Sequence, residues 1–236
     1  MSNMRHYFIT GTDTDAGKTL VASALLARAR LDGLTTLGLK PVASGCEATA
    51  EGLRNADALS LMDQTYPATD YATINPHAFE PAIAPHLAAQ RAGCKLDLEQ
   101  LTQTLKPALE QARDLVVIEG AGGWRVPLNT NQYLAELASR LELPVILVVG
   151  LKLGCLNHAQ LTAEAIKADG LELAGWVGNL LDPGFSADEA LYKENLDHLT
   201  GVLPGPCLGI VPRISATCPC ERAKKAADYL HLPIID

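Results

Sequence analysis

Short runs of apolar residues recur along the chain and alternate with longer segments in which apolar positions repeat at helical spacing. Residues 115–118 and 144–149 are apolar throughout, as expected for strands that are covered on both faces of a sheet. Amphipathic segments separate these runs, which is typical of β-α-β units. The pattern predicts strands at 7–9, 35–40, 115–118, 144–149, 173–177 and 207–211, helices at 20–30, 52–64, 82–91, 98–113, 132–141, 156–168, 187–199 and 221–230, and an irregular segment at 67–81.

This alternation predicts an α/β fold with a mainly parallel sheet and helices on both faces, formed by one domain over residues 1–236. Parallel sheets of this kind bind ligands at the carboxyl ends of their strands. Chemically useful residues come directly after most of the predicted strands. They are the segment 11–19, Lys40, Glu119, Lys152 with Gly154, Asn179, and Pro212. Their shared position predicts a single site at this edge.

The segment 10–19, Thr-Gly-Thr-Asp-Thr-Asp-Ala-Gly-Lys-Thr, lies between a predicted strand and a predicted helix. A turn with glycines in this context is typical of a phosphate-binding loop, because backbone N–H groups and the helix dipole attract phosphate oxygens. Lys18 is placed to reach the β and γ phosphates, and Thr19 to ligate Mg²⁺. Five residues separate Gly11 from Gly17 where the common pattern has four. The alternative is a polar turn before an ordinary helix.

Three further charged residues are candidates for the same chemistry. Glu119 precedes Gly-Ala-Gly-Gly, where it can hold Mg²⁺, and the alternatives are a helix cap or a solvated acid in a turn. Asp57 lies near a helix start, where an acid often only compensates the helix dipole. Lys40 ends a predicted strand and is either an edge charge or a second cation for a transferring phosphate.

The segment Lys152-Leu-Gly-Cys-Leu-Asn-His158 precedes a predicted helix. Its backbone N–H groups are suited to a substrate carboxylate, and the alternative is simple N-capping by Asn157. We assign no catalytic role to His158 or His86, and we expect Cys155 to be a buried thiol.

The net charge of −8 argues against broad binding to nucleic acid, which needs a basic surface. The N-terminal residues do not resemble a signal peptide, and the longest apolar run, 143–151, is too short to span a membrane. We therefore expect a soluble cytoplasmic protein whose six cysteines are reduced. Cys218 and Cys220 form the only close pair, which we interpret as a surface turn rather than a zinc site.

Five segments together resemble the dethiobiotin synthetase family, in the order and at close to the spacings of that family. They are 11–19, Lys40-Pro-Val-Ala-Ser-Gly45, Asn55-Ala-Asp-Ala-Leu59, Glu119-Gly-Ala-Gly-Gly-Trp124 and Val149-Gly-Leu-Lys-Leu-Gly-Cys-Leu-Asn-His158. The resemblance covers about residues 7–212 and includes the five-residue gap in the phosphate loop. It implies the fold of the P-loop NTPases, a homodimer, and closure of the ureido ring of dethiobiotin from 7,8-diaminononanoate, CO₂ and ATP with Mg²⁺.

The resemblance also implies roles for individual residues. Lys18 and Lys40 would be catalytic, and Thr19, Asp57 and Glu119 would bind the metal. The substrate would contact Ser44, Lys152, Gly154, Cys155, Leu156 and Asn157, the last four across the dimer interface. ATP would contact Thr14, Asp15, Ala16, Gly17, Lys18, Thr19, Glu119, Gly120, Ala121, Gly122, Asn179, Pro212, Arg213 and Ile214.

The chain departs from the family at Asp15, where glutamate is common, at Leu180, where an acid is common, and after Pro212. Two other classes of protein share parts of the pattern. Cobyrinate-type amidoligases usually carry an additional glutamine-hydrolysing domain, for which this chain looks too short. Partition-type ATPases carry a second lysine inside the phosphate loop, where this chain has Asp13 and Thr14.

Overall fold

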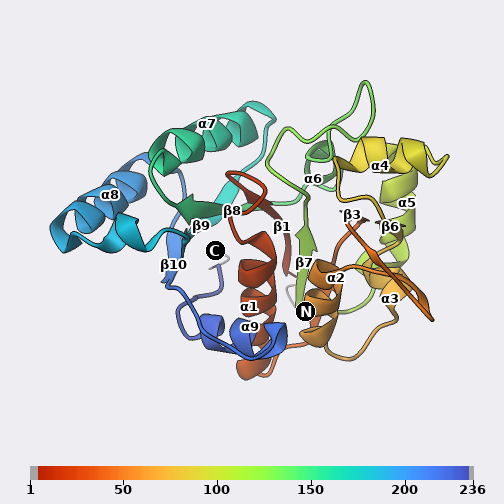
Figure 1. Ribbon diagram of the computed structural model, residues 1–236, viewed down its shortest axis with the longest axis horizontal. Coiled ribbons are helices and arrows are strands. Elements are labelled where there is room, and N and C mark those ends of the chain that lie inside the picture. Colours follow the sequence, from red (N-terminus) through yellow and green to blue (C-terminus); the bar gives the residue numbers. More distant parts are fainter. Residues whose placement is uncertain (1–4, 234–236) are drawn as a thin grey trace.

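A computed structural model of the chain describes residues 5–233 and contains a six-stranded sheet in the order β10-β9-β8-β1-β7-β2 (Figure 1). Every neighbouring pair in this sheet is parallel. The strands are β1 (Arg5–Gly11), β2 (Thr36–Leu39), β7 (Leu115–Glu119), β8 (Val145–Leu151), β9 (Leu173–Leu180) and β10 (Cys207–Val211). The α/β class predicted from the sequence is therefore confirmed. Residues 1–4, which begin the segment judged not to be a signal peptide, lie outside the described residues.

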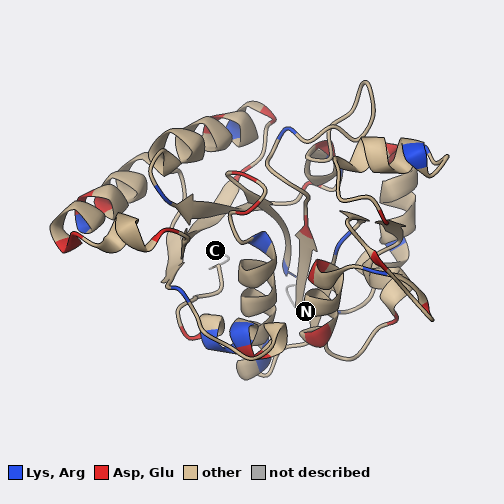
Figure 2. Cartoon of the chain, viewed as in Figure 1, with Lys and Arg blue, Asp and Glu red and all other residues tan. Residues whose placement is uncertain are grey.

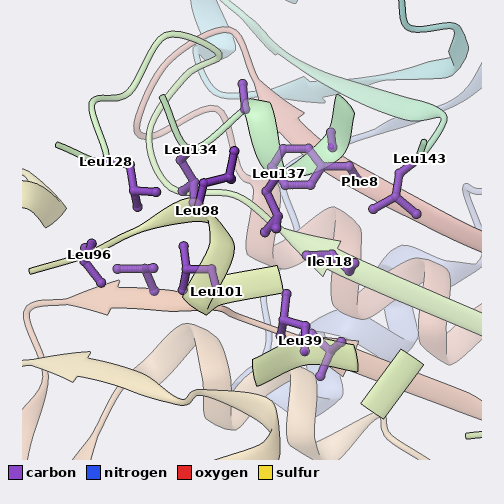
Figure 3. Packing of buried hydrophobic residues seen from close by; sticks show 14 of the residues in the cluster. Phe8, Leu39, Leu96, Leu98, Leu101, Ile118, Leu128, Leu134, Leu137 and Leu143 are labelled. Atoms are coloured by element: carbon purple, nitrogen blue, oxygen red, sulfur yellow. The ribbon is translucent and has the colours of Figure 1, made fainter. Parts of the chain in front are cut away.

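Helices cover both faces of the sheet because successive residues of each strand point to opposite sides. Phe8 and Ile118 belong to a core under α5 and α6, and Figure 3 shows them packed with Leu101 and Leu137. Tyr7, Ile9, Leu115 and Val117 pack on the opposite side with apolar residues of α1 and α9. A third core joins β8 and β9 to α7 and α8. The helices are α1 (Lys18–Leu31), α2 (Ala56–Asp63), α3 (Tyr71–Ile74), α4 (Pro85–Arg91), α5 (Leu98–Leu109), α6 (Glu136–Arg140), α7 (Cys155–Ala168), α8 (Glu189–Val202) and α9 (Pro219–Ala227), with a 3-10 turn η1 (Pro183–Ser186).

The segment between β2 and α4 differs most from the prediction. The helix expected at 52–64 begins only at Ala56, and residues 52–54 instead form β5 (Gly52–Arg54), which pairs antiparallel with β4 (Glu47–Thr49). Gly52 has a φ of 101°, a left-handed conformation that suits a tight turn and not a helix. The segment expected to be irregular contains α3 and β6 (His77–Phe79), which pairs with β3 (Val42–Ser44).

Three smaller boundaries also differ. The helix expected at 98–113 ends at Leu109, shortly after Pro107, and the helix expected at 132–141 begins at Glu136. Strand β9 continues to Leu180, so Asn179 lies within the strand rather than after it. Within residues 5–233, none of the helices combines the length and the apolar character needed to span a bilayer.

Candidate nucleotide-binding site

The loop between β1 and α1 has the backbone of a phosphate-binding turn. Gly17 has a φ of 95°, and a Cβ atom at this position would lie 2.1 Å from Nδ2 of Asn179. Glycine is therefore required both by the backbone conformation and by the neighbouring side chain. In the described part of the chain, no side-chain hydrogen bond caps the start of α1, so the N–H groups of its first turn remain available to an anion.

Lys18 is the first residue of α1 and is buried in this loop. Its Nζ donates hydrogen bonds to the carbonyl oxygens of Asp13 at 3.1 Å and Thr14 at 3.0 Å. Burial and the nearby charge of Lys40 lower the pKa of Lys18, although acidic neighbours oppose the shift. An ammonium that bonds only to loop carbonyls in the described part of the chain can exchange those partners for phosphate oxygens at little cost.

Lys40, Asp57 and Glu119 form an ionic cluster below the loop, in which Lys40 and Glu119 are buried and the side chain of Asp57 is 43% exposed. Lys40 follows β2, Glu119 ends β7, and Asp57 lies in the first turn of α2. The Nζ of Lys40 lies 2.6 Å from Oε1 of Glu119 and 3.1 Å from Oδ2 of Asp57. Strands β2 and β7 are direct neighbours in the sheet, which brings together two residues that are 79 positions apart. The prediction that these strand ends converge is confirmed for this pair.

The cluster determines the charge of its members. Burial alone would lower the pKa of Lys40, but the ion pairs with Glu119 and Asp57 outweigh it and raise the pKa above its ordinary value. Burial likewise works to raise the pKa of Asp57, and Lys40 lowers it below its ordinary value. Burial raises the pKa of Glu119 against the opposing effect of Lys40. The two carboxyl groups therefore favour the charged ammonium form of Lys40.

The oxygen atoms in this cluster fit a Mg²⁺ ion. The hydroxyl of Thr19 donates to Oε1 of Glu119 at 2.8 Å. The second oxygen, Oε2, is buried and has no hydrogen-bond partner among the described residues. Two carboxylates and a hydroxyl are the ligand types that Mg²⁺ prefers, and a buried oxygen without a partner is costly unless a cation or water binds it.

A cavity of about 340 Å³ joins the phosphate loop to this cluster. Most of the predicted loop and metal residues line it, and so does Ser44 at the end of β3. Its lining comprises Thr14, Asp15, Gly17, Lys18, Thr19, Lys40, Val42, Ala43, Ser44, Asn55, Asp57, Glu119, Ala121 and Gly122. Figure 2 shows basic and acidic residues interspersed over the outer helices, whereas Lys40 and Glu119 in this cavity form a buried ion pair.

Three other predicted nucleotide residues lie next to the cavity without lining it. Asn179 is buried and its Nδ2 donates to the carbonyl oxygen of Ala16 at 2.9 Å. The carbonyl oxygen of Gly120 accepts from Nζ of Lys40 at 3.1 Å. Asn179, Ala16 and Gly120 therefore touch the site residues but are not part of the lining of the cavity.

The remaining predicted residues lie outside this lining within the described chain. Lys152 pairs with Asp13, with 2.5 Å between Nζ and Oδ2, and so connects the loop before α7 to the phosphate loop. Gly154 precedes α7 with a φ of 93°, Cys155 is buried as expected, Leu156 is half-buried and Asn157 is exposed. In the segment after β10, Arg213 is exposed, while Pro212 and Ile214 are half-buried.

Sequence reasoning missed a set of uncharged residues that surround the ionic cluster. At the two ends of α3, the hydroxyl of Tyr71 accepts from the N–H group of Asn55 and Nδ2 of Asn75 donates to the carbonyl oxygen of Lys40. Asn55 was noted only as part of a motif, although an asparagine before a helix is a typical N-cap signal. Tyr71 and Asn75 lie in the segment interpreted as irregular, and no local pattern marks them.

Comparison with known sequences shows a close relationship to one family of enzymes. An ATP-dependent dethiobiotin synthetase of Chromohalobacter salexigens is 67% identical over 98% of this chain and 99% of its own length. The enzymes of the same name from Cellvibrio japonicus and Pseudomonas aeruginosa are 54% and 55% identical, over 98% of this chain and 97% of theirs. The chain belongs to the dethiobiotin synthetase family. A family model described as an AAA domain also matches residues 5–219.

Solved structures place this dethiobiotin synthetase family member among the P-loop NTPase folds. The septum site-determining protein MinD of Pyrococcus horikoshii, in complex with Mg-ADP, aligns with a TM-score of 0.55 over 94% of this chain and 86% of its own, at 17% identity. A ParA family ATPase of Chlorobium tepidum aligns with a TM-score of 0.58 over 94% and 96%, at 10% identity. At these identities the similarity concerns the fold alone, which agrees with the parallel sheet described above.

Proposed function

We propose that the chain is an ATP-dependent dethiobiotin synthetase, a cyclo-ligase of biotin biosynthesis. The observation that carries the proposal is the convergence of Lys18, Thr19, Lys40, Asp57 and Glu119 on one cavity beside the phosphate loop. The names of the relatives, which are similar over nearly their full length, supply the reaction.

The reaction proceeds in three steps. One amine of 7,8-diaminononanoate adds to CO₂ and loses a proton, which gives a carbamate. A carbamate oxygen attacks the γ-phosphorus of ATP and ADP leaves, so that a carbamic–phosphoric anhydride forms. The second amine attacks the carbonyl carbon, phosphate leaves, and the ureido ring of dethiobiotin closes. Each step needs reactants held in position and stabilisation of charge on phosphate oxygens.

The buried cations are suited to that stabilisation. Lys18 would turn from its loop carbonyls to the β and γ phosphates, and Lys40 would face the γ-phosphate and the carbamate oxygen. Fixed cations in a buried site act strongly because little solvent screens them. Ser44, which lines the same cavity, would contact the diamine.

Thr19, Asp57 and Glu119 would hold Mg²⁺. When bound, the ion supplies neutralisation of the phosphate charge. The Oε2 of Glu119, which has no hydrogen-bond partner within residues 5–233, and the hydroxyl of Thr19 support this assignment. The loop from Thr14 to Thr19, together with Ala121 and Gly122, would surround the phosphates. Asn179 and the segment 212–214 would contact the base.

We also propose that the enzyme is a homodimer of one-domain chains that acts in the cytoplasm. In one chain, Gly154 and Asn157 are exposed and do not line the cavity, although the family resemblance assigns the substrate carboxylate to this segment. A second copy that presents residues 154–157 to the cavity would account for both observations. Lys152, whose Nζ is paired with Asp13, would then lie near the junction.

The deciding experiment is mass spectrometry of the product formed from ATP, bicarbonate and 7,8-diaminononanoate. We expect dethiobiotin, with incorporation of label from ¹³C-bicarbonate and release of one phosphate per ring. Omission of the diamine or of bicarbonate should abolish phosphate release. ATP turnover that is stimulated only by DNA, a membrane or a protein partner would contradict the proposal and favour a partition-type ATPase.

A further inference from the structure

The short helix α3 is tied to the end of strand β2 by Asn75, a buried residue. Its Nδ2 donates to the carbonyl oxygen of Lys40 at 2.7 Å. The N–H group of Lys40 donates to the carbonyl oxygen of Ile74 at 2.8 Å. The backbone of Lys40 is therefore held on both sides by the end of α3.

Tyr71, at the other end of α3, extends this connection toward helix α2. Its hydroxyl donates to Oδ1 of Asn75 at 3.0 Å and accepts from the N–H group of Asn55 at 2.8 Å. Burial raises the pKa of Tyr71, so the hydroxyl keeps its proton and both bonds at neutral pH. The guanidinium of Arg54 lies over the ring, 4.3 Å from its centroid, and covers its outer face.

Asn55 completes the connection because it is the N-cap of α2. Its Oδ1 accepts from the N–H groups of Asp57 at 3.1 Å and Ala58 at 3.2 Å. Its Nδ2 donates to the carbonyl oxygen of Ser44 at 3.4 Å. An unbroken chain of hydrogen bonds thus runs from the backbone of Lys40 to the backbone of Asp57, the two residues whose side chains form an ion pair.

We propose that Tyr71 is a positioning residue: its hydroxyl fixes the start of α2 against the end of β2 and so places Asp57 beside Lys40. The inference rests on the proposed function for the role of Asp57 toward Mg²⁺. Removal of the hydroxyl leaves the N–H group of Asn55 without its acceptor and Oδ1 of Asn75 without its donor. The polar groups then shift to find water or new partners, because a buried unpaired group is costly.

The test compares ADP affinity with and without Mg²⁺ by calorimetry, in the wild-type protein and in Tyr71→Phe. The matched control is Tyr192→Phe. This change removes a hydroxyl from a half-buried ring of α8 that packs on Phe185 and does not line the cavity. Tyr71→Phe should weaken ADP binding about five- to tenfold in Mg²⁺, and less than about twofold in EDTA. Tyr192→Phe should leave ADP affinity unchanged in both Mg²⁺ and EDTA. An equal loss in both conditions, or no loss in Mg²⁺, would overturn the proposal.

A double-mutant cycle shows whether Tyr71 acts through Asp57. If it does, Tyr71→Phe adds little to the effect of Asp57→Asn on ADP affinity in Mg²⁺. If the two substitutions together weaken ADP binding by the product of their separate effects, Tyr71 does not act through Asp57. So would an Asp57→Asn variant with wild-type affinity, and that outcome would leave the product analysis for dethiobiotin unaffected. Asn75→Ala breaks the same hydrogen-bond chain one step further on and should give the same metal-selective loss.

Discussion

Replacement of Lys40 by methionine tests the buried ionic cluster most directly. The substitution keeps most of the length of the unbranched side chain and removes the charge that lies 2.6 Å from Glu119 and 3.1 Å from Asp57. Loss of one partner of a buried ion pair costs about 3–5 kcal/mol of the free energy of unfolding. In a chain of this length, each kcal/mol shifts the melting temperature by about 2–4 °C, so we expect a fall of roughly 6–20 °C.

The loss should depend on pH. Burial already raises the pKa of Glu119, and without the ammonium of Lys40 the pKa rises further. A carboxyl group with a raised pKa in the folded protein contributes stability below its unfolded pKa of about 4.3, and loses that contribution as the pH rises through the folded pKa. The deficit of Lys40→Met relative to the wild-type protein should therefore be smallest in acid and largest above neutral pH.

Thermal melts from acid to above neutral pH, in EDTA and in excess Mg²⁺, measure the stability deficit of Lys40→Met. Mg²⁺ should stabilise Lys40→Met more than the wild-type protein, since the ion can replace the missing charge. The double variant Lys40→Met/Glu119→Gln should recover most of the stability but none of the turnover. Turnover of the single variant should fall at least about a hundredfold, or roughly 3 kcal/mol of barrier. A deficit that is the same at every pH, or unchanged turnover, would refute the reasoning.

Three further predictions concern other parts of the site. Lys18→Ala should lower turnover at least about a hundredfold with little loss of thermal stability, since its Nζ bonds only to carbonyls of its own loop in the described structure; a melting temperature as low as that of Lys40→Met would contradict this contrast. Gly17→Ala should abolish ATP binding in a filter or calorimetric assay, because its Cβ would collide with Asn179; wild-type affinity would show that the loop adapts. If the site is shared between two copies, Asn157→Asp should bind the diamine weakly, and a re-equilibrated equal mixture with Lys40→Met should recover about a quarter of wild-type turnover at low diamine. The fraction follows because half of the dimers are mixed and each mixed dimer has one intact site of two. A mixture no more active than its components would argue against sharing.

The strands and the phosphate loop could be predicted because their signals are local. Residues 115–118 and 144–149 are short continuous apolar runs, and their length and the turn residues around them favour buried parallel strands. Gly17 and Lys18 lie at the turn between a strand and a helix, so their geometry follows from a few neighbouring residues.

The rest of the site depends on contacts between distant segments. Whether Lys40 is an exposed edge charge or a buried cation is decided by Glu119, which lies in a neighbouring strand far along the chain. The hydroxyl of Tyr71 finds its partner 16 positions away, in a segment whose sequence carries no regular periodicity. Asn179 belongs to a strand because its backbone pairs with Gly150 and Val211, and its side chain reaches the phosphate loop. Sequence pattern alone specifies none of these partners.

The order of the strands has a consequence for the newly made polypeptide. The central strand, β1, is made before the other strands of the sheet, but it pairs with β7 and β8, which come more than a hundred residues later. Thr19 and Glu119 are 100 positions apart and their side chains are hydrogen-bonded, so the proposed Mg²⁺-nucleotide site cannot form until the later half of the chain has been made. Capture of ATP is therefore a late event in biosynthesis, and protection by nucleotide against proteolysis would report that the sheet has closed around its first strand.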